Sequence, residues 1–401
     1  MDAAAAMPVR ASTARRRRTR RRVRRTILVV LAAFLVWFAI SFGSALTNPS
    51  YGTSYMARAA EWARDNHVGF LATWAEEINY KLNPPKVGGT PGGNAFTGGT
   101  TPPVKALPAA LPVPPRLRSP AGAWLPGEGV WHPAGRSVDG TPAIFTTQVR
   151  PDAVYTSYVV GVAWMDTRLL RAQLYSGSGI PGGGPYRYTA PISTLASRTL
   201  DAAFNAGFKM QDASGGYYTD HRIVLPLRPG AASLVVYRDG SATVGAWGSQ
   251  VAMTPQVVSV RQNLDLVVNG GRTVPGLLAN DNSKWGATLG GGYAVWRSGV
   301  GVTKSGALVY VGGPSLTITS LANLLVDAGA VRAMELDINT DWVQYSTFAA
   351  APGHPVSGVN GASLLSNMAG APSRYFASWW IRDFYTMSLR PSPDDHLTAH
   401  P

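Results

Sequence analysis

A stretch of 21 residues without a single charge, from Thr26 to Leu46, most constrains how this chain can fold. As a helix that rises ~1.5 Å per residue it would be about 31 Å long, which matches the hydrocarbon core of a bilayer. Ten of the preceding 25 residues are arginine. Because positive charge stays on the cytoplasmic side, the sequence predicts a cytoplasmic tail (1–25), a transmembrane anchor (26–46) and an extracytoplasmic remainder.

A cleavable signal peptide is the alternative interpretation of this stretch. The apolar core of such a peptide usually has about 7–15 residues, and Ser44-Ala45-Leu46 is a poor cleavage site. We therefore expect an uncleaved anchor that holds the chain in the cell membrane through residues 26–46, as in bacterial single-pass envelope proteins.

The net charge of +14 lies mostly in the arginine-rich tail. The tail carries +9, which leaves +5 for the other 376 residues. This balance predicts no chain-wide basic surface, so we expect no nucleic-acid partner. An RNA-associated membrane protein that uses the tail is a weaker alternative. The absence of cysteine excludes disulfides and thiol chemistry.

Beyond the anchor, composition predicts four segments: 47–82, an extracytoplasmic helical segment; 83–120, a proline- and glycine-rich linker; 121–391, a folded domain; and 392–401, a tail. Within the helical segment, Gly69 is predicted as a left-handed helix cap, and His67 as a capping or surface residue. The linker should act as a tether. In an alternative, its last part (104–117) lies along the domain surface.

The folded domain consists of short apolar runs separated by turn signals. This pattern predicts the α+β class, with a single mixed-sheet domain and helices packed on it. The predicted elements are a strand over 152–166, hairpins over 233–244 and 299–311, helices over 193–203 and 319–328, and a closing strand over 375–388. The last helix leads directly into an acidic strand; we expect Thr319 to cap its start and Gly329 to end it.

The acidic strand, 333–341, alternates apolar and polar residues. On strand geometry Glu335 and Asp337 would stand on one face, with Cα atoms about 7 Å apart. Like charges this close raise one another's pKa, which suits acid–base chemistry. The alternative is a polar strand face that simply meets water.

Three polar segments follow one another, of which the first two contain glycine: Asn205 to Asp212, Gly290 to Gly301, and the acidic strand. Together and in this order they resemble the phosphodiester glycosidase family, the family of N-acetylglucosamine-1-phosphodiester alpha-N-acetylglucosaminidase. Its usual pattern is Asn-Gly-Gly-Phe, an Arg-x-x-x-Gly strand hairpin, a helix and Leu-Asp-Gly-Gly-Gly-Ser. The match spans roughly 200–390, and the chain resembles a membrane-anchored bacterial member.

This resemblance implies hydrolysis of a sugar-1-phosphodiester in an envelope glycopolymer or glycoconjugate, on the sugar side of the phosphate. Such a leaving group needs little protonation, so the main task is to stabilise an oxocarbenium-like centre. Asp337 is the first candidate for that task, with Glu335 or Asp341 as its partner. Arg297 would bind the departing phosphate through its bidentate fork.

The same resemblance implies a set of substrate-binding residues. Asn205 would bind a sugar hydroxyl, and Asn205 with the Gly207 amide would orient the phosphate. Trp296 or Trp285 would stack on a sugar ring, and Asp341 would complete the site. Each also has a plain structural interpretation: Arg297 would pair with a surface acid, and Asn205 would only shape a turn.

The chain departs from the family pattern at several positions. Ala206 replaces a usual glycine, residues 338–341 replace the glycine-serine run, and Glu335 stands where an amide is common. Bulkier side chains there predict a differently shaped pocket, and hence a different substrate or a loss of activity. A non-catalytic module that binds envelope glycopolymers on the same scaffold is therefore the alternative function.

No cofactor is expected. Asp337, Asn339 and Asp341 imitate the first half of a Ca²⁺ loop. However, Trp342 stands where that loop requires glycine, and Phe348 where it requires a bidentate glutamate. We therefore predict no metal in the site.

Overall fold

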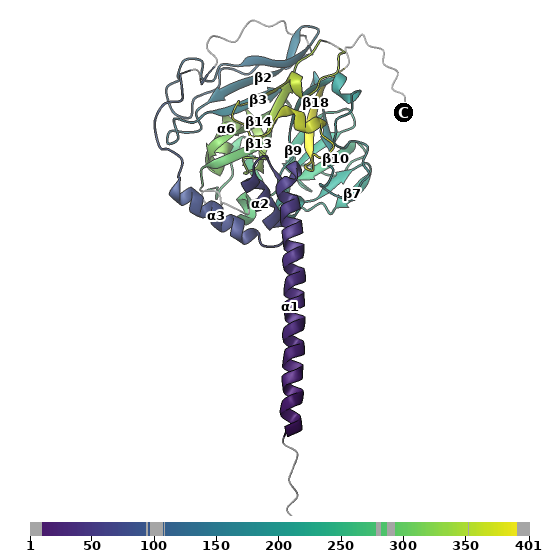
Figure 1. Ribbon diagram of the computed structural model, residues 1–401. Helices are drawn as coiled ribbons and strands as arrows, with labels where there is room; N and C mark the ends of the chain where they lie inside the picture. The colour runs from purple at the N-terminus through teal and green to yellow at the C-terminus, as the bar shows by residue number, and fades with distance from the viewer. Residues whose placement is uncertain are drawn as a thin grey trace, which may run out of the picture. The chain divides into compact units, whose positions relative to one another are not determined.

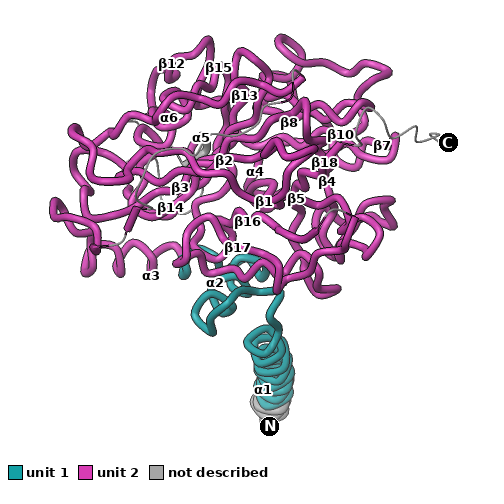
Figure 2. The backbone as a smooth tube through the Cα atoms, turned by 90° about the horizontal axis from the view of Figure 1, so that it is seen from above, with its two compact units in different colours: residues 1–72 teal, residues 73–401 magenta. Residues whose placement is uncertain are grey.

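The computed structural model describes residues 10–93, 95–96, 107, 109–277, 282–286, 293–351 and 353–390. It divides into two compact units, residues 1–72 and 73–401, which we call unit 1 and unit 2 (Figure 2). The Gly290–Gly292 loop and the tail 392–401 lie outside the described residues.

Unit 1 is helical. It holds α1 (Arg10–Thr47), a 3₁₀ turn η1 (Pro49–Tyr51), α2 (Tyr55–Asp65) and the first turn of α3 (Gly69–Leu82). Within the described ranges, Thr19–Thr47 is the one helix with the length and apolar composition to cross a membrane. The predicted apolar helix is therefore confirmed, whereas its place in a membrane stays a prediction.

The break between α2 and α3 lies where the sequence predicts it, but a different residue makes it. His67 takes the left-handed conformation, with φ of +62°, and Gly69 opens α3. The prediction of Gly69 as the cap is therefore wrong. Glycine relieves a tight contact there, because a Cβ on Gly69 would lie 3.2 Å from the Cα of Arg64.

Unit 2 contains three sheets, and their neighbouring strands pair antiparallel. The first sheet has eight strands in the order β1 (His132–Val138), β2 (Thr141–Val149), β3 (Val160–Met165), β14 (Leu308–Leu316), β13 (Val295–Thr303), β15 (Ala330–Asp337), β11 (Leu266–Asn269) and β12 (Arg272–Thr273). The second has five: β7 (Arg222–Leu225), β6 (Tyr217–Thr219), β10 (Val257–Gln262), β8 (Ala232–Tyr237) and β9 (Ala242–Ala246). The third has β17 (Gly361–Ser363), β16 (Tyr345–Phe348), β5 (Leu200–Asn205), β18 (Phe384–Leu389) and β4 (Leu170–Tyr175).

Few helices accompany these sheets. In the described part of unit 2 they are the rest of α3, α4 (Met210–Ala213), α5 (Asn282–Trp285) and α6 (Ile318–Asp327), with 3₁₀ turns η2 (Ala196–Arg198), η3 (Gly358–Asn360) and η4 (Pro372–Phe376). The predicted α+β class is confirmed, with the predicted sheet divided into three.

The eight-stranded sheet separates two apolar layers. One face packs on α6, which lies against β13 and β14 in Figure 1, and buries Leu321, Leu324 and Leu325. The other face meets the two five-stranded sheets in a layer that includes Met334 and Leu336. The acidic strand β15 therefore runs through the centre of the domain rather than along a wet surface.

Both predicted hairpins are confirmed, as β8–β9 and β13–β14. The predicted helix 193–203 is wrong: residues 196–198 form only the short turn η2, and residues 200–203 belong to strand β5. Ala202 and Ala203, which favour a helix locally, are fully buried in a strand that pairs with β16 and β18. Pairing on both sides outweighs the helical preference of alanine, which is the highest of the amino acids but small in energy.

Two predicted strands are shorter than the sequence suggests. Of 152–166, only β3 is a strand, because Asp152 Oδ1 accepts hydrogen bonds from the N–H groups of Val154 and Tyr155, each at 2.8 Å. This Asx turn uses backbone donors that a strand ladder would need. Of 375–388, residues 375–376 form the end of η4, and only residues 384–388 belong to strand β18.

The proline- and glycine-rich segment touches the domain at both ends. The N–H of Gly88 donates to the carbonyl oxygen of Val154 at 2.7 Å. Further on, Leu111 and Leu117 are buried in the α6-side layer, and the N–H of Leu111 donates to Asp166 Oδ2 at 2.7 Å. These contacts correspond to the alternative in which the last part of the segment lies along the domain.

Helix α6 begins with a reciprocal cap at Thr317, two residues before the predicted cap Thr319. Thr317 Oγ1 accepts from the N–H of Ser320 at 3.0 Å, and Ser320 Oγ accepts from the N–H of Thr317 at 2.9 Å. We expect Thr317→Ala to lower the free energy of unfolding by about 1 kcal/mol, measured by urea denaturation. Thr319→Ala is the matched control and should have little effect, because Thr319 Oγ1 has no hydrogen-bond partner among the described residues. A larger loss from the control would contradict this assignment of the cap.

Candidate functional site

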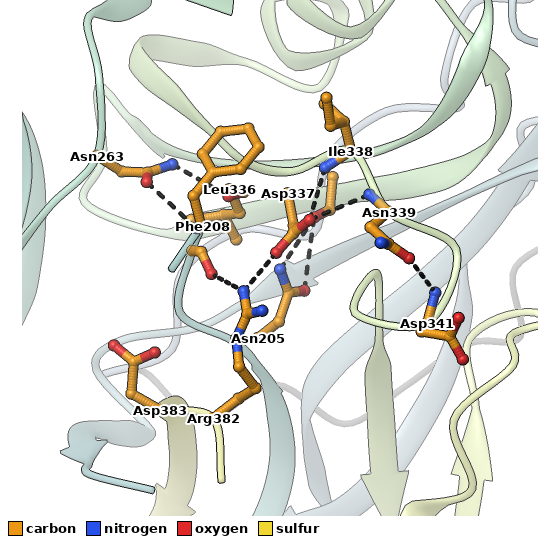
Figure 3. A network of polar contacts seen from close by, with 12 residues as sticks. Asn205, Phe208, Asn263, Leu336, Asp337, Ile338, Asn339, Asp341, Arg382 and Asp383 are labelled. Atoms are coloured by element: carbon orange, nitrogen blue, oxygen red, sulfur yellow. Dashed lines mark hydrogen bonds and ion pairs between the residues drawn. The ribbon is translucent and has the colours of Figure 1, made fainter. Parts of the chain in front are cut away.

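Polar side chains from distant parts of the chain meet near the end of β15 (Figure 3). The predicted site residues lie at the following places: Asn205 and Gly207 at the end of β5, Trp296 and Arg297 in β13, Glu335 and Asp337 in β15, and Asp341 in the turn after β15. Strand β13 pairs directly with β15, which brings the arginine strand beside the acidic one. The structure thus gathers these segments, although not in the arrangement that strict alternation predicts.

A β-bulge separates the two carboxylates. Asp337 pairs with Ser298 and Glu335 with Gly299, so one extra residue stands on β15 at this point. A bulge breaks the period of two and re-aims the side chain that follows it. Glu335 and Asp337 consequently pair with two different arginines instead of standing side by side.

Asp337 is held by three donors. Its Oδ1 accepts from the N–H groups of Ile338 at 2.8 Å and Asn339 at 3.0 Å. Its Oδ2 accepts from Arg382 Nη2 at 2.8 Å, in an ion pair that is almost fully buried. Backbone N–H groups and a guanidinium around one carboxylate favour its ionised form.

Arg382 is the functional candidate that the sequence analysis missed. The same Nη2 donates to the carbonyl oxygen of Gly207 at 2.8 Å, and the guanidinium carbon lies 4.7 Å from the centre of the Trp342 ring. The arginine thereby joins the turn after β5 to the end of β15 (Figure 3). The sequence did contain a signal for this residue: Arg382 and Asp383 form a charged pair inside an otherwise apolar stretch. Charged residues within an apolar stretch are also what marked the acidic strand β15 as a candidate site.

A second buried ion pair supports this turn. Arg261 Nε donates to Asp383 Oδ2 at 2.9 Å, and both side chains are fully buried. Asn263 lies between the turn and β15: its Oδ1 accepts from the N–H of Phe208 at 3.3 Å, and its Nδ2 donates to the carbonyl oxygen of Leu336 at 3.1 Å. These residues position the peptide backbone around Asp337.

Arg297 forms a closed pair with Glu335. Arg297 Nη1 donates to Glu335 Oε1 at 2.6 Å, and the two residues are 0% and 1% exposed. Its other N–H groups donate to the backbone carbonyls of Leu316, Trp285 and Tyr293. The guanidinium therefore does not face an open space across from the acids, as a phosphate-binding role would require.

Burial raises the pKa of Glu335 to about 7, against the opposing effect of Arg297 and with a small contribution from Asp337. Because the folded-state pKa lies above the unfolded value of about 4.3, this group stabilises the fold fully below pH 4 and loses that stabilisation as pH rises through 7. We expect the free energy of unfolding, relative to Glu335→Gln, to fall by about 2–3 kcal/mol between pH 5 and pH 8. Urea titrations of both proteins at the two pH values measure it. An equal pH slope for both proteins would contradict the raised pKa.

Asn205 is bound within the fold. Its Nδ2 donates to Ser298 Oγ at 3.1 Å, and its Oδ1 accepts from the Tyr310 hydroxyl at 3.0 Å and from the N–H of Gln344 at 3.3 Å. The amide thus links β5 to β13, β14 and the start of β16. Both the nitrogen and the oxygen of the Asn205 amide are therefore hydrogen-bonded within the protein. This is typical of a residue that holds a turn in place.

The remaining predicted site residues differ in setting. Gly207 has φ of +153°, and a Cβ there would lie 3.1 Å from the Asn263 side chain, so glycine is required for close packing. Trp296 is half-buried against the layer between the sheets. Asp341 is buried, and its carbonyl oxygen accepts from Arg374 Nη1 at 2.8 Å.

The side-chain oxygen atoms of Asp337 and Asn339, two of the three residues in the predicted calcium-like motif, have protein partners. Both Asp337 oxygens accept the bonds given above, and Asn339 Oδ1 accepts from the N–H of Asp341 at 2.9 Å. In the part of the chain that the structure describes, no group of three or more histidine, aspartate and glutamate side chains could hold a metal.

Two cavities occur at another place in unit 2. The larger has a volume of about 580 Å³ and the smaller about 50 Å³, and they share Gln148 and Leu364 in their walls. Of the described residues that line them, none is a predicted site residue. The carboxylates and arginines of the candidate site are themselves buried, with Asp337 2% and Arg382 5% exposed.

No family model matches this chain, and no curated protein sequence does. Among solved structures, the chain is remotely similar to the catalytic domain of a phosphodiester glycosidase. That structure is the zebrafish N-acetylglucosamine-1-phosphodiester alpha-N-acetylglucosaminidase catalytic domain, auto-inhibited by its pro-peptide. It has 15% identity and a TM-score of 0.39, over 64% of this chain and 87% of that one.

Two further structures are similar at the same remote level. A hypothetical protein from Synechocystis has 12% identity and a TM-score of 0.34, over 64% of each chain. A putative exported protein from Burkholderia pseudomallei has 12% identity and a TM-score of 0.26, over 58% of this chain and 74% of that one. At such scores the resemblance carries no argument about activity, so the proposal below depends on the residues themselves.

Proposed function

We propose that this chain is a membrane-anchored extracytoplasmic hydrolase that cleaves sugar-1-phosphodiester bonds in envelope glycopolymers or glycoconjugates. One observation carries the proposal: the Asp337 carboxylate, at the end of β15, and the Arg382 guanidinium, just before β18, meet at 2.8 Å beside the Gly207 turn. These are the two groups that the reaction needs. A carboxylate stabilises the developing charge at the sugar, and a cation receives the departing phosphate.

In the proposed mechanism the substrate phosphate competes with Asp337 for Arg382. When the phosphate takes the guanidinium, Asp337 is released and faces the anomeric carbon. The bond between this carbon and the phosphate oxygen breaks, and its electron pair leaves with the phosphate monoester. Water, or Asp337 followed by water, supplies the new oxygen, and the water proton passes to solvent or to the leaving phosphate.

Within this proposal the cationic role passes from Arg297 to Arg382. Arg297 and Glu335 serve as a structural pair that fixes β13 against β15. Asn205 and Gly207 position the turn whose carbonyl oxygen orients Arg382. The Trp342 ring makes a cation–π contact with the Arg382 guanidinium and thereby helps to fix its position.

A non-catalytic glycopolymer-binding module is the second candidate, and one observation favours it. Asp337 and Arg382 are buried and paired with each other, with Asp337 only 2% exposed. A domain that has lost catalytic activity would retain such buried ion pairs because they stabilise the fold. Binding of the polymer would then take place elsewhere on the domain.

The test uses the full-length protein in detergent and a panel of methylphospho-1-sugars in ¹⁸O-labelled water. Cleavage on the sugar side should release free sugar that carries ¹⁸O, together with unlabelled methyl phosphate. Label in the phosphate would instead indicate attack at phosphorus and contradict the proposed mechanism. Protein that is inert on every substrate but still binds envelope glycopolymer would favour the binding module.

A further inference from the structure

The larger of the two cavities, of about 580 Å³, lies where β2 of the first sheet meets the edge of the third sheet. Gln148 of β2 forms one wall, and Gly361, Ser363 and Pro372, from the segment that runs from β17 to η4, form another. This volume is in the range of small-molecule sites in proteins, ~300–1,000 Å³. The mechanism proposed above uses none of these residues.

The side chains around this cavity are polar but uncharged. Gln148 carries an amide, Ser363 and Ser366 carry hydroxyls, and none of the described residues in the walls carries a charge. Leu364 and Pro372 add apolar surface. A sugar hydroxyl both donates and accepts hydrogen bonds, as amides and hydroxyls do, whereas a phosphate is bound most strongly by cations. The walls therefore match a neutral sugar ring, with its hydroxyls and its C–H face, better than a phosphate.

Strand β17 adds backbone groups to these side chains. It stands at the edge of the third sheet, beside β16. The N–H of Leu364 donates to the carbonyl oxygen of Tyr345 in β16 at 3.0 Å. Because alternate residues of an antiparallel strand point their backbone groups to the partner, the Gly361 carbonyl and both backbone groups of Ser363 point away from β16. Gly361 and Ser363 line the cavity, and Ala362 between them does not, so the edge of β17 offers these groups to a ligand.

The smaller cavity, of about 50 Å³, continues this polar region. It shares Gln148 and Leu364 with the larger cavity, and His132 of β1 also lines it. His132 Nε2 is buried and has no hydrogen-bond partner among the described residues. Since a water molecule needs ~10–15 Å³, a water held here would give His132 a partner beside Gln148. Gln148 Nε2 donates to the carbonyl oxygen of Leu364 at 3.4 Å, a long bond that a sugar hydroxyl can replace.

The 3₁₀ turn η4 connects the larger cavity to the candidate site. Pro372, its first residue, lines the cavity. Arg374, two residues further on, donates from Nη1 to the carbonyl oxygen of Asp341, in the turn that follows β15. At ~2.0 Å per residue, Pro372 and Arg374 are about 4 Å apart along the axis of the turn. A cavity this close to the candidate site suits a second subsite for the same polymer.

We propose that the larger cavity is a subsite for a neutral sugar unit of the envelope glycopolymer, separate from the pair of Asp337 and Arg382. The choice of a glycopolymer rests on the proposed function. The choice of a neutral sugar rests on the amide, the hydroxyls and the strand edge in the walls. In a hydrolase this subsite holds sugar units that are not cleaved, and in the non-catalytic alternative it is the place where the polymer binds.

Saturation-transfer NMR tests this inference on the full-length protein, in a detergent without a sugar headgroup. The probes are the methyl glycosides of glucose, galactose, mannose and N-acetylglucosamine. Gln148→Leu removes the amide at similar volume and should weaken binding of the best probe by about 2–10-fold, the effect of one hydrogen bond. Gln173→Leu is the matched control and should bind like the wild type. Gln173 of β4 is also half-buried, and its Nε2 also donates to a backbone carbonyl, that of Leu174 at 3.2 Å, but it does not line the cavity.

Further outcomes separate the subsite from the proposed reaction. Inorganic phosphate should not displace the glycoside, and folded Asp337→Asn should still bind it. Displacement by phosphate, no binding of any probe, or equal effects of the two glutamine changes would overturn the subsite. Binding lost in Asp337→Asn but kept in Gln148→Leu would also overturn it, and would leave the proposed function intact. Binding that depends on Gln148 in a protein that cleaves no sugar-1-phosphodiester would instead support the subsite and overturn the hydrolase.

Discussion

Replacing Asp337 by asparagine is expected to lower kcat for release of sugar from a sugar-1-phosphodiester by about 10²–10⁴-fold, the range typical of one carboxylate at a reacting centre. Asparagine keeps the shape and can still accept the N–H groups of Ile338 and Asn339. It removes the negative charge that the proposed mechanism places against the developing cation at the sugar. Steady-state assays of reducing-sugar release, at saturating substrate, measure the effect.

The control for this prediction must account for lost stability. Removing one partner of a buried pair costs about 3–5 kcal/mol, so Asp337→Asn leaves Arg382 uncompensated. Asp166→Asn is a matched control, because Asp166 is also buried and accepts from two backbone N–H groups, those of Leu111 and Arg168. It should lose stability and keep its activity per folded molecule. Full activity in folded Asp337→Asn would end the enzymatic proposal.

The sequence predicts an element of this fold correctly when neighbouring residues determine it, and less well when residues far apart in the chain determine it. The hairpins, α6 and the helical break after α2 follow from periodicity and turn chemistry, which are local. The helix predicted over 193–203 fails because Ala202 and Ala203 pair with strands more than 100 residues away. No local pattern reports that pairing, and it outweighs a weak intrinsic preference.

The candidate site divides in the same way. The acidic strand is visible because charged residues interrupt an apolar run. The β-bulge that turns Asp337 away from Glu335 is not visible, since it depends on the register between β13 and β15. That Arg382 and not Arg297 pairs with Asp337 likewise depends on topology. Strand β18, which follows Arg382, pairs with β5 and so brings this arginine to the site. The sequence predicts which residue types meet, and the register decides which of them form pairs.

The pair of Arg297 and Glu335 gives the second large expected effect. Arg297→Met should lower the free energy of unfolding by about 3–5 kcal/mol, because it leaves a buried carboxylate without its partner. The loss should be smaller at pH 5 than at pH 8, since Glu335, with a pKa raised to about 7, is neutral at the lower pH. Urea denaturation at both pH values measures it.

The double variant Arg297→Met/Glu335→Leu decides what the pair does. Replacing a whole buried ion pair by apolar side chains of similar volume is often neutral or stabilising, so most of the single-variant loss should be recovered. If the pair is structural, this variant also retains its activity, because Asp337 and Arg382 are unchanged. A folded double variant without activity would instead restore Arg297 to the phosphate-binding role that the family resemblance implies. Stability and activity, measured on one protein, therefore separate the two assignments of the cation.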